Sequence, residues 1–315
     1  MKMLTVIIFR SPSQDPRKHE LEEGILAALA REPDVVSAAM PHLYDFGEAD
    51  AAMASLRSVT GPLLVLAWLY PRAIHWTLDR LGIKGQCGET QLHRADVAAD
   101  SQKETLKSGA SAPARTIWSL DLRDGDNVVM HVEEIQRILR EIHAAPLPTQ
   151  DGSLSPSPLP IPHPTSNAQN PPLHRWYPVI DYGRCNQCME CLDFCLFGVY
   201  DVNDDGHVVV ESPGNCKKGC PACSRVCPEN AIIFPMHRTP SIAGAPGARL
   251  DVQKLDLSEL FGAPAAVKLA ADERNAALVG DGRKAVADPQ HRDDKETKPK
   301  DNLDKLMDAL DDAKL

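Results

Sequence analysis

Eight of the nine cysteines in this 315-residue chain lie between Cys185 and Cys227, and Cys87 alone stands apart. An odd and tightly clustered set argues against a disulfide framework and favours metal binding. The cysteines form two runs, Cys185-x2-Cys188-x2-Cys191-x3-Cys195 and Cys216-x3-Cys220-x2-Cys223-x3-Cys227-Pro228. This part of the chain is therefore expected to fold around metal.

Cysteines at this spacing suit cuboidal iron–sulfur clusters, because three thiolates from one tight loop can reach three corners of a cluster. The fourth cysteine of each run is carried away on a helical turn and reaches the other cluster. Crossed ligation of this kind predicts one site from Cys185, Cys188, Cys191 and Cys227. It predicts a second site from Cys216, Cys220, Cys223 and Cys195.

A pair of zinc sites is the alternative, since four thiolates also suit tetrahedral zinc. Zinc ribbons, however, usually separate two C-x2-C pairs by a long spacer. Here three cysteines are packed between Cys185 and Cys191. The spacing therefore favours two [4Fe–4S] clusters over zinc.

The cysteine runs and their flanking sequence, residues 173–238, resemble the bacterial ferredoxin family with two [4Fe–4S] clusters. The resemblance implies an α+β dicluster ferredoxin domain, taken here as residues 173–240, with short hairpins and two small helices. Between two valine-rich stretches, Asn203-Asp204-Asp205-Gly206 also predicts a hairpin with an Asp-Gly turn.

Two positions depart from the ferredoxin pattern. Leu196 stands where the family often has proline, and the second run opens with three intervening residues, Lys217-Lys218-Gly219, instead of two. Neither change removes a ligand. The two lysines are expected either to raise the potential of the second cluster or dock an acidic partner, or to be solvated loop residues.

Residues 1–145 are expected to form an α/β domain. Apolar runs over 4–9, 35–40, 63–70 and 116–122 predict strands, and helical patterns separate or follow them. Four β-α units imply a small parallel sheet covered by helices, similar to flavodoxin. No glycine-rich phosphate motif follows the first strand, which disfavours nucleotide binding.

Two segments of this domain, within residues 4–140, resemble the sirohydrochlorin chelatase family. They are Ser11-Pro12-Ser13-Gln14-Asp15-Pro16-Arg17 and Leu69-Tyr70-Pro71-Arg72-Ala73-Ile74-His75. In that family a histidine near each place handles the incoming metal, and in this chain only the second, His75, is present. The resemblance implies an alternative function as a tetrapyrrole metal chelatase, or a tetrapyrrole-handling protein, with a ferredoxin appendage. Otherwise His75 is an exposed or locally satisfied helix residue.

The remaining segments are expected to lack a core. Residues 146–172 carry nine prolines and predict a semi-extended linker between two separate domains. Residues 241–315 predict a mostly disordered tail with a short amphipathic helix, Asn302–Leu315. This helix is either nascent or docks in a partner's groove. Cys87, next to Gly88, is either a redox-active thiol or incidental, and we favour the second reading.

Charge and hydropathy limit the function. A formal net charge of −10 excludes a basic nucleic-acid footprint, and no apolar run is long enough to cross a membrane. Because Arg10 ends the first apolar run, a signal peptide is not expected and a cytoplasmic location is. The sequence thus predicts an electron-transfer protein with unidentified redox partners, an N-terminal docking domain and no catalytic residues. We expect a carrier or an oxidoreductase subunit rather than an enzyme.

Overall fold

The computed structural model of the chain describes residues 3–48, 50–93, 115–125, 127–144, 175–246 and 266–280. The expected linker and the expected helix Asn302–Leu315 lie outside these residues. The chain divides into two compact units, Met1–Glu273 and Arg274–Leu315. In the second unit, the described residues are the end of helix α10 (Ala266–Gly280).

A five-stranded parallel sheet forms the N-terminal domain, in the order β2-β1-β3-β5-β4. Its strands are β1 (Leu4–Phe9), β2 (Val35–Met40), β3 (Leu63–Ala67), β4 (Gln86–Cys87) and β5 (Thr116–Asp121). Every pairing in this sheet is parallel, with Thr5 of β1 opposite Leu63 of β3. The prediction of a small parallel α/β sheet is confirmed.

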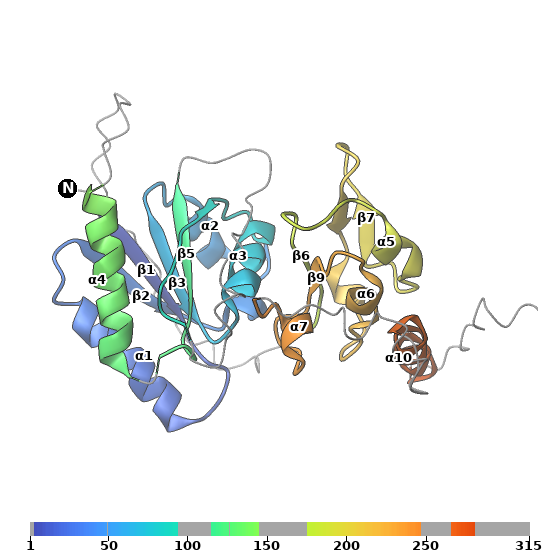
Figure 1. Cartoon of the computed structure of the whole chain (residues 1–315), viewed down its shortest axis with the longest axis horizontal. Helices are drawn as coiled ribbons and strands as arrows, with labels where there is room; N and C mark the ends of the chain where they lie inside the picture. The colour runs from blue at the N-terminus through green and yellow to red at the C-terminus, as the bar shows by residue number, and fades with distance from the viewer. Residues whose placement is uncertain are drawn as a thin grey trace, which may run out of the picture. The chain divides into compact units, whose positions relative to one another are not determined.

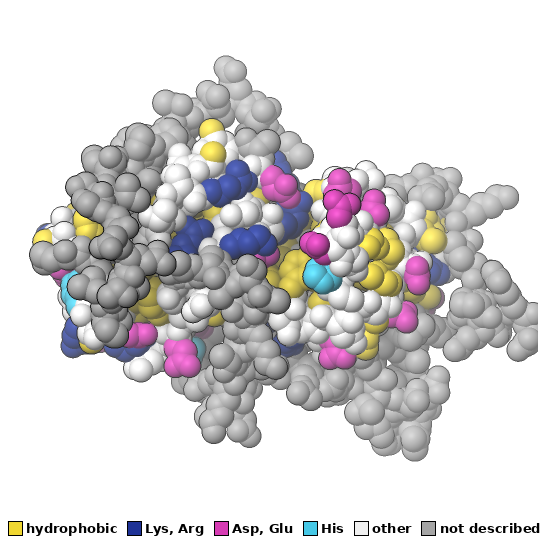
Figure 2. Space-filling model, turned by 90° about the horizontal axis from the view of Figure 1, so that it is seen from above, with side chains coloured by type: hydrophobic (Ala, Val, Ile, Leu, Met, Phe, Trp, Pro, Cys, Tyr) yellow, Lys and Arg dark blue, Asp and Glu magenta, His cyan; other side chains and the backbone are white. Residues whose placement is uncertain are grey.

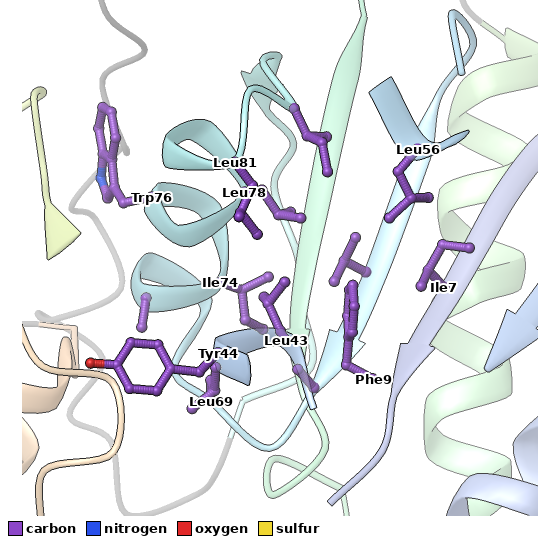
Figure 3. Close-up of a cluster of buried hydrophobic side chains, with 14 of the residues drawn as sticks. Ile7, Phe9, Leu43, Tyr44, Leu56, Leu69, Ile74, Trp76, Leu78 and Leu81 are labelled. Atoms are coloured by element: carbon purple, nitrogen blue, oxygen red, sulfur yellow. The ribbon is translucent and has the colours of Figure 1, made fainter. Parts of the chain in front are cut away.

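Helices cover both faces of this sheet, which explains why β1 and β3 are buried at every position. Figure 1 shows α1 (Pro16–Leu29) and α4 (Val128–Ala144) on one face, with α2 (Ala51–Arg57) and α3 (Pro71–Arg80) on the other. Alternate residues of β1 enter the two cores: Ile7 and Phe9 face the α3 side, and Ile8 faces the α1 side. Figure 3 shows the core on the α3 side.

Strand β4 is a difference from the sequence prediction, which places strands only at 4–9, 35–40, 63–70 and 116–122 of this domain. The strand has only two residues, Gln86 and Cys87, which pair with Thr116 and Ile117 at the edge of the sheet. Neither residue of β4 is buried. A strand this short, without a buried side chain, leaves no hydrophobic periodicity to read.

The eight clustered cysteines lie in a separate set of short elements, the cysteine segment (residues 175–246). Strand β6 (Val179–Ile180) pairs antiparallel with β9 (Ile232–Ile233), and β7 (Tyr200–Val202) pairs antiparallel with β8 (Val208–Val210). The expected hairpin turn is present, with Gly206 at φ +78°. Three short helices complete the segment: α5 (Glu190–Phe194), α6 (Ala222–Val226) and α7 (Pro240–Ala243).

The N-terminal domain and the cysteine segment share one hydrophobic core. Tyr177, Val179 and Ile233 of the cysteine segment belong to the same buried cluster as Ile74 and Trp76 of α3. The sequence analysis expected separate domains on either side of a linker. Helix α3 explains the difference, since its residues from Arg72 to Leu78 are all buried, toward the sheet on one side and toward β6 on the other.

Helix α10 lies within the segment expected to be a mostly disordered tail, and residues 266–280 of it are helical. Its sequence, AVKLAADERNAALVG, is rich in alanine, leucine and charged residues with high helix propensity. Among the described helices, none combines the length and the apolar content needed to span a bilayer.

Candidate iron–sulfur sites

The first cysteine run occupies a tightly bent loop that leads into α5. Gln187 and Met189 have φ values of +61° and +64°, a region that side-chain-bearing residues rarely adopt. Helix α5 then carries Cys191, and Cys195 ends it by donating its N–H to the Cys191 carbonyl at 3.2 Å. The helix thus displaces the fourth cysteine of the run from the loop that holds the other three.

The second run repeats this arrangement. Gly219, at φ +84°, bends the loop between Cys216 and α6. Helix α6 carries Cys223, and Cys227 ends it by donating its N–H to the Cys223 carbonyl at 3.2 Å. In both runs a helix of five residues therefore separates the fourth cysteine from the preceding loop.

The structure brings the eight thiols together in two groups, each drawn from both runs. Burial raises the pKa values of Cys185, Cys191, Cys216 and Cys223, and nearby thiols of the same group raise each of these four pKa values further. The first thiol group is Cys185, Cys188, Cys191 and Cys227. The second thiol group is Cys216, Cys220, Cys223 and Cys195.

The two groups lie in a largely apolar environment, and the first group is exposed at Cys188. Cys191, Cys223 and Cys227 are buried, and Cys188 is exposed. Burial is the main cause that raises the pKa of Cys191 to about 12 and that of Cys223 well above its ordinary value. Thiols in such surroundings stay protonated without a bound cation, so deprotonation has to accompany metal binding.

Two hydrogen bonds point at sulfur atoms of the groups. In the first group, the N–H of Ala231 donates to Cys227 Sγ at 3.2 Å. In the second, the buried hydroxyl of Tyr200 donates to Cys223 Sγ at 3.1 Å. Donors of this kind stabilise negative charge on sulfur, and they are among the features that set the potential of an iron–sulfur cluster.

Tyr200 also lies near thiols of both groups. Burial and the nearby thiols of Cys223 and Cys191 raise its pKa well above the ordinary value for tyrosine. Cys223 belongs to the second group and Cys191 to the first. The neutral phenol therefore stands between the two groups as a hydrogen-bond donor.

Within the described residues, no group of three or more His, Cys, Asp and Glu side chains is arranged to hold a single metal ion. A cuboidal cluster makes a different demand, since its four thiolates bind separate iron atoms. The donor set fits that demand: four thiols per group, apolar burial and hydrogen bonds to sulfur. The fit is chemical, and ligation itself stays a prediction.

The other candidate residues lie apart from the thiol groups. His75 on α3 is 4% exposed and packs edge-on against Trp76, with ring centroids 5.0 Å apart. Burial lowers the pKa of His75, which favours the neutral ring. Cys87 is half-buried on β4, and burial raises its pKa to about 12, so it is a poor nucleophile.

Sequence reasoning missed three residues that shape the sites: Tyr200, Asp181 and Arg72. Tyr200 follows the first cysteine run by five residues, and its position in the sequence does not indicate that its hydroxyl is buried against a thiol. Asp181 precedes Cys185 by one turn, which is typical of a residue that caps a loop. Arg72 comes from the other domain, and no local pattern links it to the cysteines.

A curated protein of Methanocaldococcus jannaschii, described as an uncharacterized ferredoxin, is 53% identical to this chain over 66 residues. The chain therefore contains a segment that is similar to a ferredoxin. The matched residues are 21% of this chain and 44% of the relative, so the chain spans less than half the length of the ferredoxin it matches. No protein-family model and no solved structure matches the chain, and the similarity therefore concerns the ferredoxin segment alone.

Proposed function

We propose that this chain is an electron-transfer protein that carries two [4Fe–4S] clusters, one on each thiol group. The observation that carries the proposal is the gathering of eight thiols into two crossed groups of four. Similarity to a ferredoxin supports it independently. Each cluster, when bound, exchanges one electron at a time.

The protein's own residues hold and surround the clusters. Four thiolates per group supply ligands, and apolar residues, including Ile180 and Phe234, exclude water from them. Ala231 and Tyr200 donate hydrogen bonds to sulfur, which favours the reduced and more negative state. No described residue is needed as an acid, a base or a nucleophile for this function.

Exposed Cys188 marks the side of the first thiol group where a redox partner can approach. Asn186 accepts the Cys188 N–H at 3.1 Å, and its amide lies 3.3 Å from exposed Glu229. Exposed Glu190 follows two residues after Cys188. Figure 2 shows one face of the molecule. On this face, most charged side chains of the cysteine segment are Asp and Glu, and most of those on the N-terminal domain are Lys and Arg. The proposed partner therefore presents a basic surface to the cluster.

The chelatase alternative requires a metal to reach His75. Only 4% of that side chain is exposed, and α3, which carries it, packs against β6 of the cysteine segment. The geometry thus favours the carrier over the chelatase. In the carrier, α3 is used for contact with the cysteine segment, and the other surfaces of the N-terminal domain remain for docking.

Metal analysis tests the proposal directly. Protein purified without oxygen is expected to contain about eight irons and eight acid-labile sulfides per chain, four of each per cluster. The measurement is colorimetric iron and sulfide analysis on the full chain, with zinc quantified in the same sample. Stoichiometric zinc without sulfide would overturn the proposal.

Tyr200→Phe tests the hydrogen bond to Cys223. Loss of the donor is expected to lower the reduction potential of the second cluster by about 59 mV, a tenfold change in a one-electron equilibrium. The first cluster is expected to keep its potential. The measurement is a redox titration followed by electron paramagnetic resonance (EPR).

Tyr182→Phe is the matched control for Tyr200→Phe. The Tyr182 hydroxyl donates to the Val208 carbonyl at 3.1 Å and not to a thiol. This variant is expected to leave the second cluster's potential unchanged. An equal shift in both variants would show that the hydrogen bond to sulfur is not the cause.

A further inference from the structure

Arg72 of the N-terminal domain reaches into the first thiol site. Its side chain is 4% exposed at the start of α3. Its Nε donates to Asp181 Oδ2 at 2.5 Å, and its Nη2 donates to the carbonyl of Asn230 at 2.5 Å. One guanidinium group therefore joins two places in the cysteine segment that are 49 positions apart in sequence.

Asp181 shapes the turn that presents Cys185. Its Oδ1 accepts the N–H groups of Gly183 at 2.9 Å and Arg184 at 3.2 Å. Its carbonyl accepts the N–H of Cys185 at 2.9 Å. The Asp181 side chain is 2% exposed, so the ion pair with Arg72 is buried at both ends.

Asn230 shapes the segment that follows Cys227. It has φ +51°, in the left-handed region, and its N–H donates to the Cys227 carbonyl at 3.3 Å. The next residue, Ala231, donates its N–H to Cys227 Sγ. The Ala231 carbonyl accepts the Asp181 N–H at 2.8 Å, so a backbone hydrogen bond joins the chain before Cys185 to the chain after Cys227.

We propose that Arg72 is a positioning residue for the first iron–sulfur cluster, so that the N-terminal domain sets the reduction potential of that cluster. The inference rests on the proposed function. Arg72 holds the backbone on both sides of the first thiol group, before Cys185 and after Cys227. It also pairs with the buried carboxylate of Asp181, whose backbone carbonyl accepts the Cys185 N–H.

Arg72→Met removes both contributions. The buried Asp181 carboxylate then loses the nearer of its two cations and keeps only Arg184, whose Nε lies 3.7 Å from Asp181 Oδ2. The negative charge that is no longer compensated opposes the extra negative charge of the reduced cluster. The first cluster's potential is expected to fall by at least 59 mV, a tenfold change in its one-electron equilibrium. The second cluster is expected to be unchanged. The measurement is an EPR-monitored redox titration of the full chain, purified without oxygen.

Second variants separate a loss of charge from a general loss of structure. Arg72→Met combined with Asp181→Asn removes both charges and keeps an oxygen that can accept the Gly183 and Arg184 N–H groups. The double variant is expected to recover most of the shift. Arg72→Lys keeps the charge and is expected to shift the potential less than Arg72→Met.

Arg123→Met is the matched control from the same domain. Arg123 pairs with buried Asp121 at 2.5 Å, at the end of β5, and stacks on Tyr70 rather than on the cysteine segment. It is expected to change neither potential. Tyr200→Phe identifies the second cluster's signal, so Arg72→Met has to move the other signal.

Each outcome decides the inference. Potentials unchanged in Arg72→Met, or shifted as much in Arg123→Met, would overturn it. The Arg72→Met protein can also contain less iron than the wild type. In that case the inference requires a loss of about four irons, with the second cluster retained. A loss of all eight irons would overturn it. Wild-type protein without iron and sulfide defeats the proposed function instead, and this result is distinct from a fully loaded protein insensitive to Arg72.

Discussion

The Cys185→Ala/Cys227→Ala double variant is expected to keep one cluster and to contain about four irons and four sulfides per chain. These two thiols lie in different runs but in the same thiol group. Their loss leaves the second thiol group with all four of its ligands. Iron and sulfide analysis on anaerobic protein, with EPR of the reduced sample, measures the result.

Cys185→Ala/Cys195→Ala is the matched control, since it removes two cysteines from one run and one from each thiol group. Both groups are then incomplete, and we expect little or no iron. If each run held its own cluster, the two results would be exchanged. The control would keep four irons, and the first double variant would keep none.

Tyr44→Ala is expected to lower the free energy of unfolding by about 3–5 kcal/mol, as for other buried aromatic residues. Tyr44 is 1% exposed and lies against Tyr177 with ring centroids 4.2 Å apart. The Tyr44 hydroxyl donates to the Tyr177 carbonyl and accepts the Tyr177 N–H at 2.7 Å. In return, the Tyr177 hydroxyl donates to the Tyr44 carbonyl at 3.2 Å. The measurement is chemical denaturation followed by circular dichroism.

Tyr44→Phe measures the contribution of the Tyr44 hydroxyl alone to the free energy of unfolding. It keeps the ring contact and leaves the buried N–H of Tyr177 without an acceptor, at an expected cost of about 1–3 kcal/mol. Tyr70→Phe is the control, because Tyr70 is half-buried in the same domain and its hydroxyl makes no hydrogen bond within the described residues. Equal losses in the two phenylalanine variants would show that the contact with Tyr177 is not the cause.

Strand positions in the N-terminal domain could be predicted because its central strands are buried on both faces. Leu63–Ala67 is apolar at every position and Leu4–Phe9 at every position but Thr5, and that pattern is visible without a structure. Gln86–Cys87 could not be predicted, since its stability comes from pairing with β5 at the sheet edge. Hydrogen bonds between backbones leave no trace in side-chain periodicity.

The cysteine spacing predicts the crossed thiol groups, because a short helix separates the fourth cysteine from the loop before it, and the structure has such a helix in each run. The spacing could not predict the residues that hold those loops in place. Arg72 and Asp181 are 109 positions apart and meet only because α3 packs on β6. Tyr44 and Tyr177 are 133 positions apart, and neither lies in a motif. Contacts of this kind depend on tertiary packing, which a single sequence does not encode locally.

The N-terminal domain and the cysteine segment share a hydrophobic core, and this changes the role expected of the residues that connect them. The two halves are joined by interlocking side chains, the Arg72–Asp181 ion pair and the paired tyrosines, Tyr44 and Tyr177. The peptide connection raises their effective concentration, and the contacts among the described residues already define an interface. A gene split between the codons for residues 145 and 175 would therefore encode two polypeptides with complementary surfaces. In evolutionary terms, a carrier and its companion subunit could become one chain, or separate again, without redesign of the interface.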